Sequence, residues 1–234
     1  MRVRALLGLS LILGVTLPAG ATPTGLNNIP TADVVPRRVL VLQQFTNGGV
    51  SQTFFYTGGF KYGVAKNLEV GLDARLGKSN ADAPSLGVGG AGGAPSRPVA
   101  QVKYRLPLGS PDLAFGVGIA NVGASTRTAG HPAYYGVFSS KLGDGHGHLG
   151  FLGQRASDNL FVGYDRKLGS RTTLRADLLR GLNGDGSAWL GSIGFITQLQ
   201  SDFLVESWVS LPGQSSVRET FTLKFNYVLD LSRK

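Results

Sequence analysis

The sequence contains no cysteine and few charged residues, which make up 16% of its 234 positions. An exported chain of this length can fold without a disulfide framework. Long apolar runs are also scarce, because none of 18 residues follows the N-terminal region, and mean hydropathy is near neutral. These absences exclude a helical-bundle membrane protein. They are compatible with a barrel in which apolar and polar positions alternate and average out.

The chain begins like a secretory signal peptide. Arg2 and Arg4 precede an apolar core from Leu6 to Leu17, and the small residues Ala19-Gly20-Ala21 follow it. This order of basic, apolar and small residues predicts export with cleavage after Ala21, so that residues 1–21 are a signal peptide. The core is too short to span a membrane as a helix.

The remaining chain is basic. Removing Arg2 and Arg4 from the 23 basic residues leaves 21 against 14 acidic ones, a net charge of +7. Rim cations that meet lipid head groups or lipopolysaccharide phosphates explain this surplus, and so does a basic lumen that attracts anions. Nucleic-acid binding is not expected, because the basic residues are scattered and no binding motif is present.

The stretch 218–230 shows the pattern that dominates the chain. Alternate residues are apolar, namely Phe221, Leu223, Phe225, Tyr227 and Leu229. The residues between them are mainly polar, namely Thr222, Lys224, Asn226 and Asp230, with Val228 as the exception. Side chains alternate faces along a strand, so this stretch predicts a two-faced strand that is long enough to cross a bilayer when tilted.

The same alternation recurs about a dozen times between turn residues. Strands are predicted at 37–46, 52–63, 67–77, 97–106, 112–121, 132–142, 147–155, 159–168, 171–180, 187–198, 202–211 and 218–230. Connections after the even-numbered strands are mostly tight, and the longest of the others is Lys78–Ser96. Outer-membrane barrels have short periplasmic turns and longer outside loops, so this long connection is expected outside.

We therefore predict an all-β fold, a closed antiparallel transmembrane β-barrel of about 12 strands, with about 10–14 compatible with the pattern. A soluble sandwich also alternates, but its strands are shorter, at about five or six residues. Glycine and alanine on the polar face, as at Gly116 and Gly118, suit a crowded lumen better than a solvated surface. Residues 22–36 are predicted as an extended lead-in on the periplasmic side or tucked into the barrel. The barrel itself is predicted for residues 37–234.

Three similar runs each place a tyrosine before a basic turn: Tyr62-Gly-Val-Ala-Lys-Asn-Leu, Tyr104-Arg-Leu-Pro-Leu-Gly and Tyr164-Asp-Arg-Lys-Leu-Gly. An aromatic girdle with rim cations has this pattern. In this respect the sequence resembles bacterial outer-membrane β-barrel proteins as a broad, porin-like class, over residues 37–230. It departs from that class at its end, Leu231-Ser-Arg-Lys234, where such barrels usually carry an aromatic residue.

Candidate chemistry is sparse. A rim hydrolase would need a His–Ser pair, and His131 lies near Ser125 and Thr126 in sequence, but a loop residue is the simpler interpretation. The run Asp144-Gly-His-Gly-His148 has the spacing of metal ligands, yet Gly and Asp are ordinary turn formers. We therefore expect neither an enzyme nor a bound metal or cofactor.

The charges expected to face the lumen are the candidate site. They are Lys61, Glu69, Asp73, Arg75, Lys103, Arg105, Arg171, Arg175, Asp177, Glu206 and Lys224, with Asp230 as a further acidic residue. These charges predict either a pore for small polar or anionic solutes or a salt-bridged, non-conducting interior of a structural or interaction barrel. Gly116 and Gly118 favour the pore, whereas the bulky Leu204 and Trp208 favour filling. The expected partners are outer-membrane lipid, small solutes and an envelope protein, for a monomeric barrel.

Overall fold

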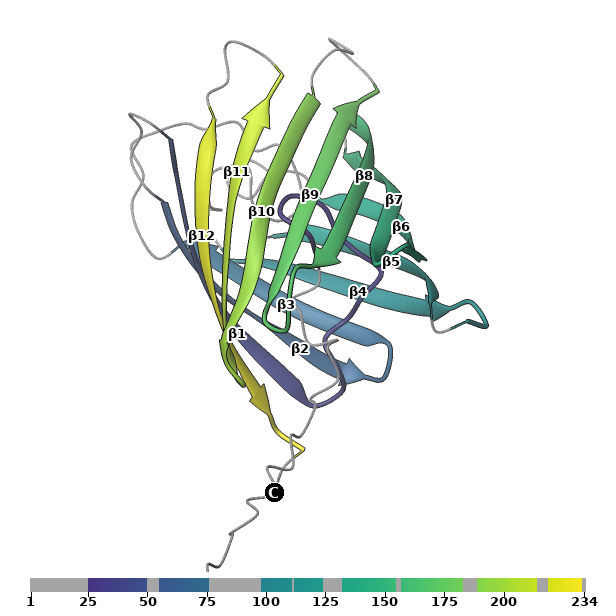
Figure 1. The fold of residues 1–234 in the computed structure, drawn as a ribbon. Helices are drawn as coiled ribbons and strands as arrows, with labels where there is room; N and C mark the ends of the chain where they lie inside the picture. Colours follow the sequence, from purple (N-terminus) through teal and green to yellow (C-terminus); the bar gives the residue numbers. More distant parts are fainter. Residues whose placement is uncertain are drawn as a thin grey trace, which may run out of the picture.

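The computed structural model describes residues 25–49, 55–75, 98–110, 112–123, 132–154, 157–182, 189–213 and 219–232, and these form a closed antiparallel barrel (Figure 1). Its strands are β1 (Val39–Gly49), β2 (Phe55–Ala65), β3 (Leu68–Arg75), β4 (Val99–Pro107), β5 (Leu113–Val122), β6 (Ala133–Leu142), β7 (Gly145–Gln154), β8 (Ser157–Lys167), β9 (Thr172–Gly181), β10 (Trp189–Gln200), β11 (Phe203–Pro212) and β12 (Thr220–Asp230). The predicted fold class is confirmed, and each predicted strand has its counterpart.

The barrel closes where β1 pairs with β12, in a register that runs from Val39 opposite Asp230 to Gly49 opposite Thr220. Every strand therefore has a neighbour on both sides, so its backbone N–H and C=O groups can pair within the sheet. The tight turns after the even-numbered strands lie at the end of the barrel where β1 begins and β12 ends. We call this the turn end.

Side chains alternate between the outer face and the lumen as the sequence predicts. Large apolar residues are exposed on the outer face of many strands, among them Leu42, Leu72, Val102, Val117, Leu149, Val162, Ile193, Phe195, Val209 and Phe221. Burying such a surface in hydrocarbon is favourable, whereas leaving it in water is not. No helix of the described residues is long and apolar enough to cross a membrane.

Residues 25–36 lie inside the barrel, where Figure 1 shows them as a purple segment surrounded by strands. The sequence leaves two positions for this lead-in, and the structure shows the one tucked into the barrel. Leu26, Ile29 and Ala32 are buried in an apolar cluster whose other members come from the wall: Ala114, Ala120, Ala133, Tyr135, Val137, Leu152, Phe161, Leu179 and Leu190. We refer to residues 25–36 as the plug segment.

Candidate functional site

The lumen wall binds the first part of the plug segment through β9, β10 and β11. The backbone N–H of Asn28 donates to Oδ2 of Asp177 at 3.0 Å, and its side-chain amide donates to Ser210 Oγ at 3.1 Å. The Asn27 amide donates to Ser192 Oγ at 2.9 Å. Ser192 in turn donates to Oδ1 of Asp177 at 2.7 Å, so one carboxylate organises this contact.

The opposite wall, formed by β3 and β4, binds the last part of the segment. The Lys103 ammonium donates to the carbonyl oxygens of Thr31 at 2.9 Å and Asp33 at 3.0 Å. Glu69 Oε2 accepts the N–H of Val35 at 2.8 Å. Lys103 and Glu69 are almost fully buried, and such charges are stable only when they are paired or hydrogen-bonded. Backbone groups of the plug segment therefore supply part of the hydrogen bonding that these two buried wall charges need in place of water.

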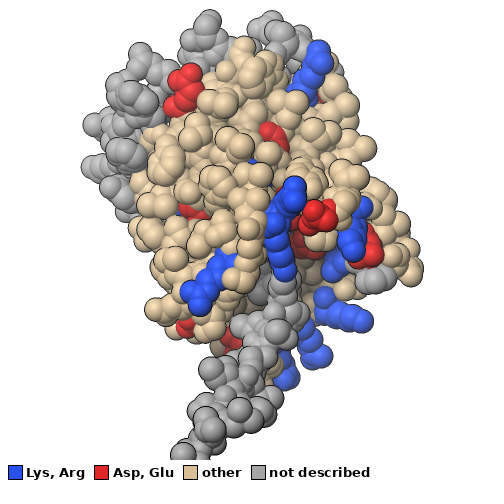
Figure 2. Space-filling model, in the orientation of Figure 1, with Lys and Arg blue, Asp and Glu red and all other residues tan. Residues whose placement is uncertain are grey.

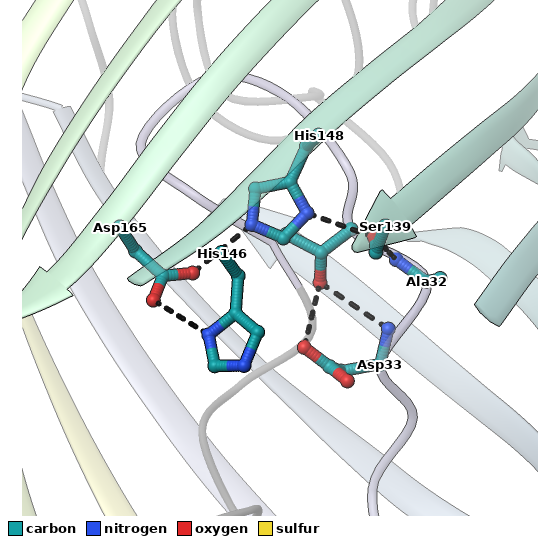
Figure 3. A network of polar contacts seen from close by, with 7 residues as sticks. Ala32, Asp33, Ser139, His146, His148 and Asp165 are labelled. Atoms are coloured by element: carbon teal, nitrogen blue, oxygen red, sulfur yellow. Dashed lines mark hydrogen bonds and ion pairs between the residues drawn. The ribbon is translucent and has the colours of Figure 1, made fainter. Parts of the chain in front are cut away.

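A hydrogen-bond chain joins the middle of the segment to β6, β7 and β8 (Figure 3). The N–H of Ala32 donates to Ser139 Oγ at 3.0 Å, and this oxygen lies 2.8 Å from Nδ1 of His148. Nε2 of His148 lies 3.0 Å from Oδ2 of Asp165. His146 approaches the other Asp165 oxygen, with Nδ1 at 3.4 Å. With a neutral imidazole, Ser139 donates to Nδ1 and Nε2–H donates to Asp165, so every group in the chain has a partner.

Strand register explains this arrangement. Ser139 and His148 stand directly opposite each other across β6 and β7. His148 faces Gly163 on β8, and Asp165 is the next inward residue along that strand. Since glycine has no side chain, the imidazole can reach the diagonal carboxylate, which lies within range of such pairs.

A serine, a histidine and an aspartate in hydrogen-bond contact resemble the catalytic group of hydrolases. Here the residue Ser139 is only 8% exposed and the His148 side chain 1% exposed. The serine hydroxyl also accepts a backbone N–H from the plug segment, which covers it. In this structure the chain of contacts fixes Ala32 to the wall.

A charged cluster occupies the lumen between β9, β11 and β12. Glu206, 2% exposed, contacts Arg175 Nη1 at 2.7 Å and Lys224 Nζ at 3.1 Å, and it accepts the Asn226 amide at 2.7 Å. Gln43 then donates to Asn226 at 2.9 Å. Pairing with hydrogen bonds on the remaining lone pairs is the arrangement that makes buried charge tolerable.

Glycines on the lumen face make room for other residues rather than for an open path. A Cβ added at Gly116 would lie 2.9 Å from Ala32 Cα, and one at Gly118 would overlap the Tyr135 ring. At Gly163 it would meet the side chains of Leu26 and Ile29. The interpretation of Gly116 and Gly118 as free pore space is therefore wrong, because the plug segment and Tyr135 fill it.

The structure brings most of the predicted charges together inside the barrel. Glu69, Lys103, Arg175, Asp177 and Glu206 are buried, and Lys61, Asp73, Arg105 and Lys224 are half-buried on the same inward-facing positions. Arg171 instead lies in the exposed turn before β9 and so belongs to the rim. Asp230 ends β12 at the turn end. Arg75 ends β3, but its side chain lies outside what the structure describes.

The other sequence candidates separate. Asp144 lies in the turn between β6 and β7 and pairs with Arg166 at 3.1 Å, whereas His146 and His148 belong to β7 and contact Asp165. Across the described ranges, no group of three or more His, Cys, Asp or Glu residues is placed to hold a metal ion. His131, Ser125 and Thr126 lie outside the described residues, as does the Lys78–Ser96 connection.

Sequence reasoning missed Ser139, Asp165 and the asparagines Asn27 and Asn28. Ser139 and Asp165 do sit on the inward parity of their strands, which was the available signal. The two asparagines lie in a segment without periodicity, and nothing in their spacing indicates that wall serines bind them.

Comparison with solved structures places this architecture among known barrels. The KdgM porin matches with a TM-score of 0.55 at 10% identity, over 81% of this chain and 98% of that one. The chain has the fold of outer-membrane porins. The KdgM porin in complex with disordered oligogalacturonate matches with a TM-score of 0.56 at 10% identity, over the same shares. The NanC porin matches with a TM-score of 0.55 at 9% identity, over 80% of this chain and 98% of that one. No protein-family profile matches the sequence, and neither does any curated protein.

Proposed function

We propose that the chain is a porin-like channel of the bacterial outer membrane that passes small polar or anionic solutes and performs no catalysis. The observation that carries the proposal is a closed barrel with an apolar outer face and a charged, hydrogen-bonding lumen. A β-sheet in hydrocarbon can pair all its backbone N–H and C=O groups only when it is closed. A polar interior, in turn, is what hydrated solutes require.

Charge placement bears on the solute. The described inward side chains balance, with Lys61, Lys103, Arg105, Arg175 and Lys224 against Glu69, Asp73, Asp165, Asp177 and Glu206. Most of the exposed cations among the described residues lie at the turn end, as Arg37, Arg38, Lys66, Lys141, Arg166, Lys167 and Arg171, and Figure 2 shows most of the blue side chains toward that end. Arg180 is exposed at the opposite end of β9. A basic rim raises the local concentration of anions and also suits lipid head groups. We infer a weak preference for anions, set at the rim.

Export and insertion complete the proposal. Cleavage after Ala21 would deliver a mature chain that inserts into the outer membrane as a monomer, with the turn end in the periplasm. Mass spectrometry of the membrane-inserted protein should find Thr22 as its first residue. An N-terminus that still carries residues 1–21 would refute the cleaved signal.

A second candidate is a non-conducting structural barrel, and one observation favours it. The plug segment and the buried Glu206 cluster occupy part of the lumen in this structure. The two candidates differ in whether ions ever pass.

Single-channel recording decides between them. The refolded mature chain is inserted into planar bilayers under a salt gradient, and both step size and reversal potential are recorded. Discrete steps, even if brief, with a mildly anion-selective reversal potential are expected for the channel. A heat-modifiable, protease-resistant barrel that never conducts would sink the channel and leave the structural barrel.

A further inference from the structure

The plug segment is bound by the barrel without being part of its sheet. β1 already pairs with β2 and β12 along its length. The segment meets the sheet backbone at its C-terminal end, where the Pro36 carbonyl accepts the Val39 N–H and the next residue, Arg37, forms a bridge to Gly63. Its contacts with the wall are made mainly by wall side chains, on β3, β4, β6, β9, β10 and β11. Removing it would therefore break no strand pair.

The wall is nevertheless shaped and polarised to fit an extended peptide. Gly116 and Gly163 leave room for the segment, as the close approach of an added Cβ to Ala32, Leu26 and Ile29 shows. Backbone groups of the segment meet wall groups of the opposite hydrogen-bonding sense: N–H groups meet Asp177, Ser139 and Glu69, and carbonyl oxygens meet the Lys103 ammonium. Such a fit at successive positions along a chain is what a peptide-binding site has.

We propose that the lumen wall is a binding site for an extended peptide, occupied here by residues 25–36 as a removable plug that must leave before solute can pass. This rests on the proposed channel function. The wall groups that hold the segment are carboxylates, hydroxyls and an ammonium, which water or a polar solute can hydrogen-bond in its place. Arg37 and Arg38 anchor the departing segment at the turn end, since Arg38 N–H bonds the Gly63 carbonyl.

A reversible lock tests the proposal on the full-length mature chain. Because the protein has no cysteine, the double variant Ala32→Cys with Gly116→Cys introduces one thiol pair. A Cβ at Gly116 would lie 3.4 Å from Ala32 Cβ and 2.9 Å from Ala32 Cα, so the segment must shift slightly away from the wall. That shift brings the two Cβ atoms into the range of about 3.5–4.5 Å found in disulfides. The two single-cysteine variants are the matched controls.

Conductance of the double variant is recorded after oxidation and again after reduction in the same bilayer. Oxidation should abolish the conducting steps, and reduction should restore them, with no effect of either reagent on the single variants. Equal conductance in both states would overturn the plug while leaving the channel function intact. Failure of the two thiols to join under oxidant would count against the position of the segment and thus against the proposal.

Thiol labelling gives a test that needs no conductance. In the Ala32→Cys variant, a charged methanethiosulfonate reagent should label the folded barrel slowly but to completion, as the segment leaves its site. Ser201→Cys, in the exposed turn between β10 and β11, should label at once. A folded, heat-modifiable Ala32→Cys barrel whose introduced thiol never reacts would show a permanent core element and overturn the proposal, whether or not the barrel conducts.

The Ser139 contact should set how tightly the plug is held. Ser139→Ala leaves the Ala32 N–H without its acceptor, so labelling at Ala32→Cys should become at least several-fold faster. Ser140→Ala, the neighbouring residue on the outer face, removes an equivalent hydroxyl and should not change the rate. Equal acceleration by both substitutions would assign the effect to general loosening of β6 and count against the proposal.

Discussion

Removing Glu206 should destabilise the barrel far more than removing its partner Lys224. Glu206 is the single anion between two cations, with Arg175 at 2.7 Å and Lys224 at 3.1 Å. Replacing it with alanine leaves two positive charges close together in a buried site and deprives Asn226 of an acceptor. Breaking a buried pair from one side costs about 3–5 kcal/mol, and we expect Glu206→Ala to fall in that range.

Lys224→Met should change the free energy of unfolding much less. Glu206 keeps Arg175 and the Asn226 amide, and the repulsion of Lys224 by Arg175 and by Lys61 disappears. The methionine also avoids burying an ammonium. The loss is then about one hydrogen bond, or below about 1.5 kcal/mol.

Both free energies of unfolding are measured by urea titration of barrels refolded in lipid vesicles, followed by tryptophan fluorescence. Glu219→Ala, an exposed residue before β12, is the matched carboxylate control and should stay within about 0.5 kcal/mol of the parent. Equal losses for Glu206→Ala and Lys224→Met would refute the reasoning, because they would mean that water, rather than Glu206, compensates the two cations.

Two further substitutions test the lumen and the outer face. Gly163→Val should push against the plug segment and speed labelling at Ala32→Cys without unfolding the barrel. Gly147→Val is the control, because its added side chain is in ordinary contact range of its neighbour, and it should leave the labelling rate unchanged. Similar labelling rates for both variants would contradict a wall whose shape fits the segment. Leu149→Arg, in the middle of β7 on the exposed outer face, should cost about 2–4 kcal/mol in lipid, and Leu142→Arg at the turn end about 0–1 kcal/mol, by the same urea titration. Equal costs would show that β7 does not cross the hydrocarbon at its middle.

The sequence predicts the wall of the barrel well because alternation is a local property. In β12, Phe221, Leu223, Phe225 and Tyr227 follow a period of two, and any sheet that buries one face must keep that period. Tight turns can also be predicted from local sequence, although their exact boundaries can be off by a few residues. The sequence predicts a turn for the run around His146, but residues 143–144 suffice for the connection and β7 begins at Gly145.

The occupant of the lumen could not be predicted in the same way, because it depends on contacts across the barrel. Ser139 and Asp165 meet His148 only through the registers of three strands, and Asn28 meets Asp177 across 149 positions of the chain. A segment such as 25–36 has neither the two-residue period of a strand nor the 3.6-residue period of a helix, so its sequence does not reveal which of its faces is buried. The sequence therefore leaves two positions open for this segment, on the periplasmic side or inside the barrel, and does not decide between them.

The structure reverses the interpretation of the lumen glycines, which the sequence suggested were free space for solute. A barrel of twelve strands is wider than the eight-stranded form that side chains fill, so its interior holds either water or another piece of chain. Water adapts to any wall and places no demand for glycine at particular positions. A peptide does, because its backbone approaches the wall closely at some residues and not at others. Gly116 and Gly163 stand where Ala32, Leu26 and Ile29 come closest, and the wall charges stand where backbone groups of the segment would otherwise be unpaired. This wall is complementary to a peptide first, and in the proposed mechanism it becomes a path for solute only when that peptide has left.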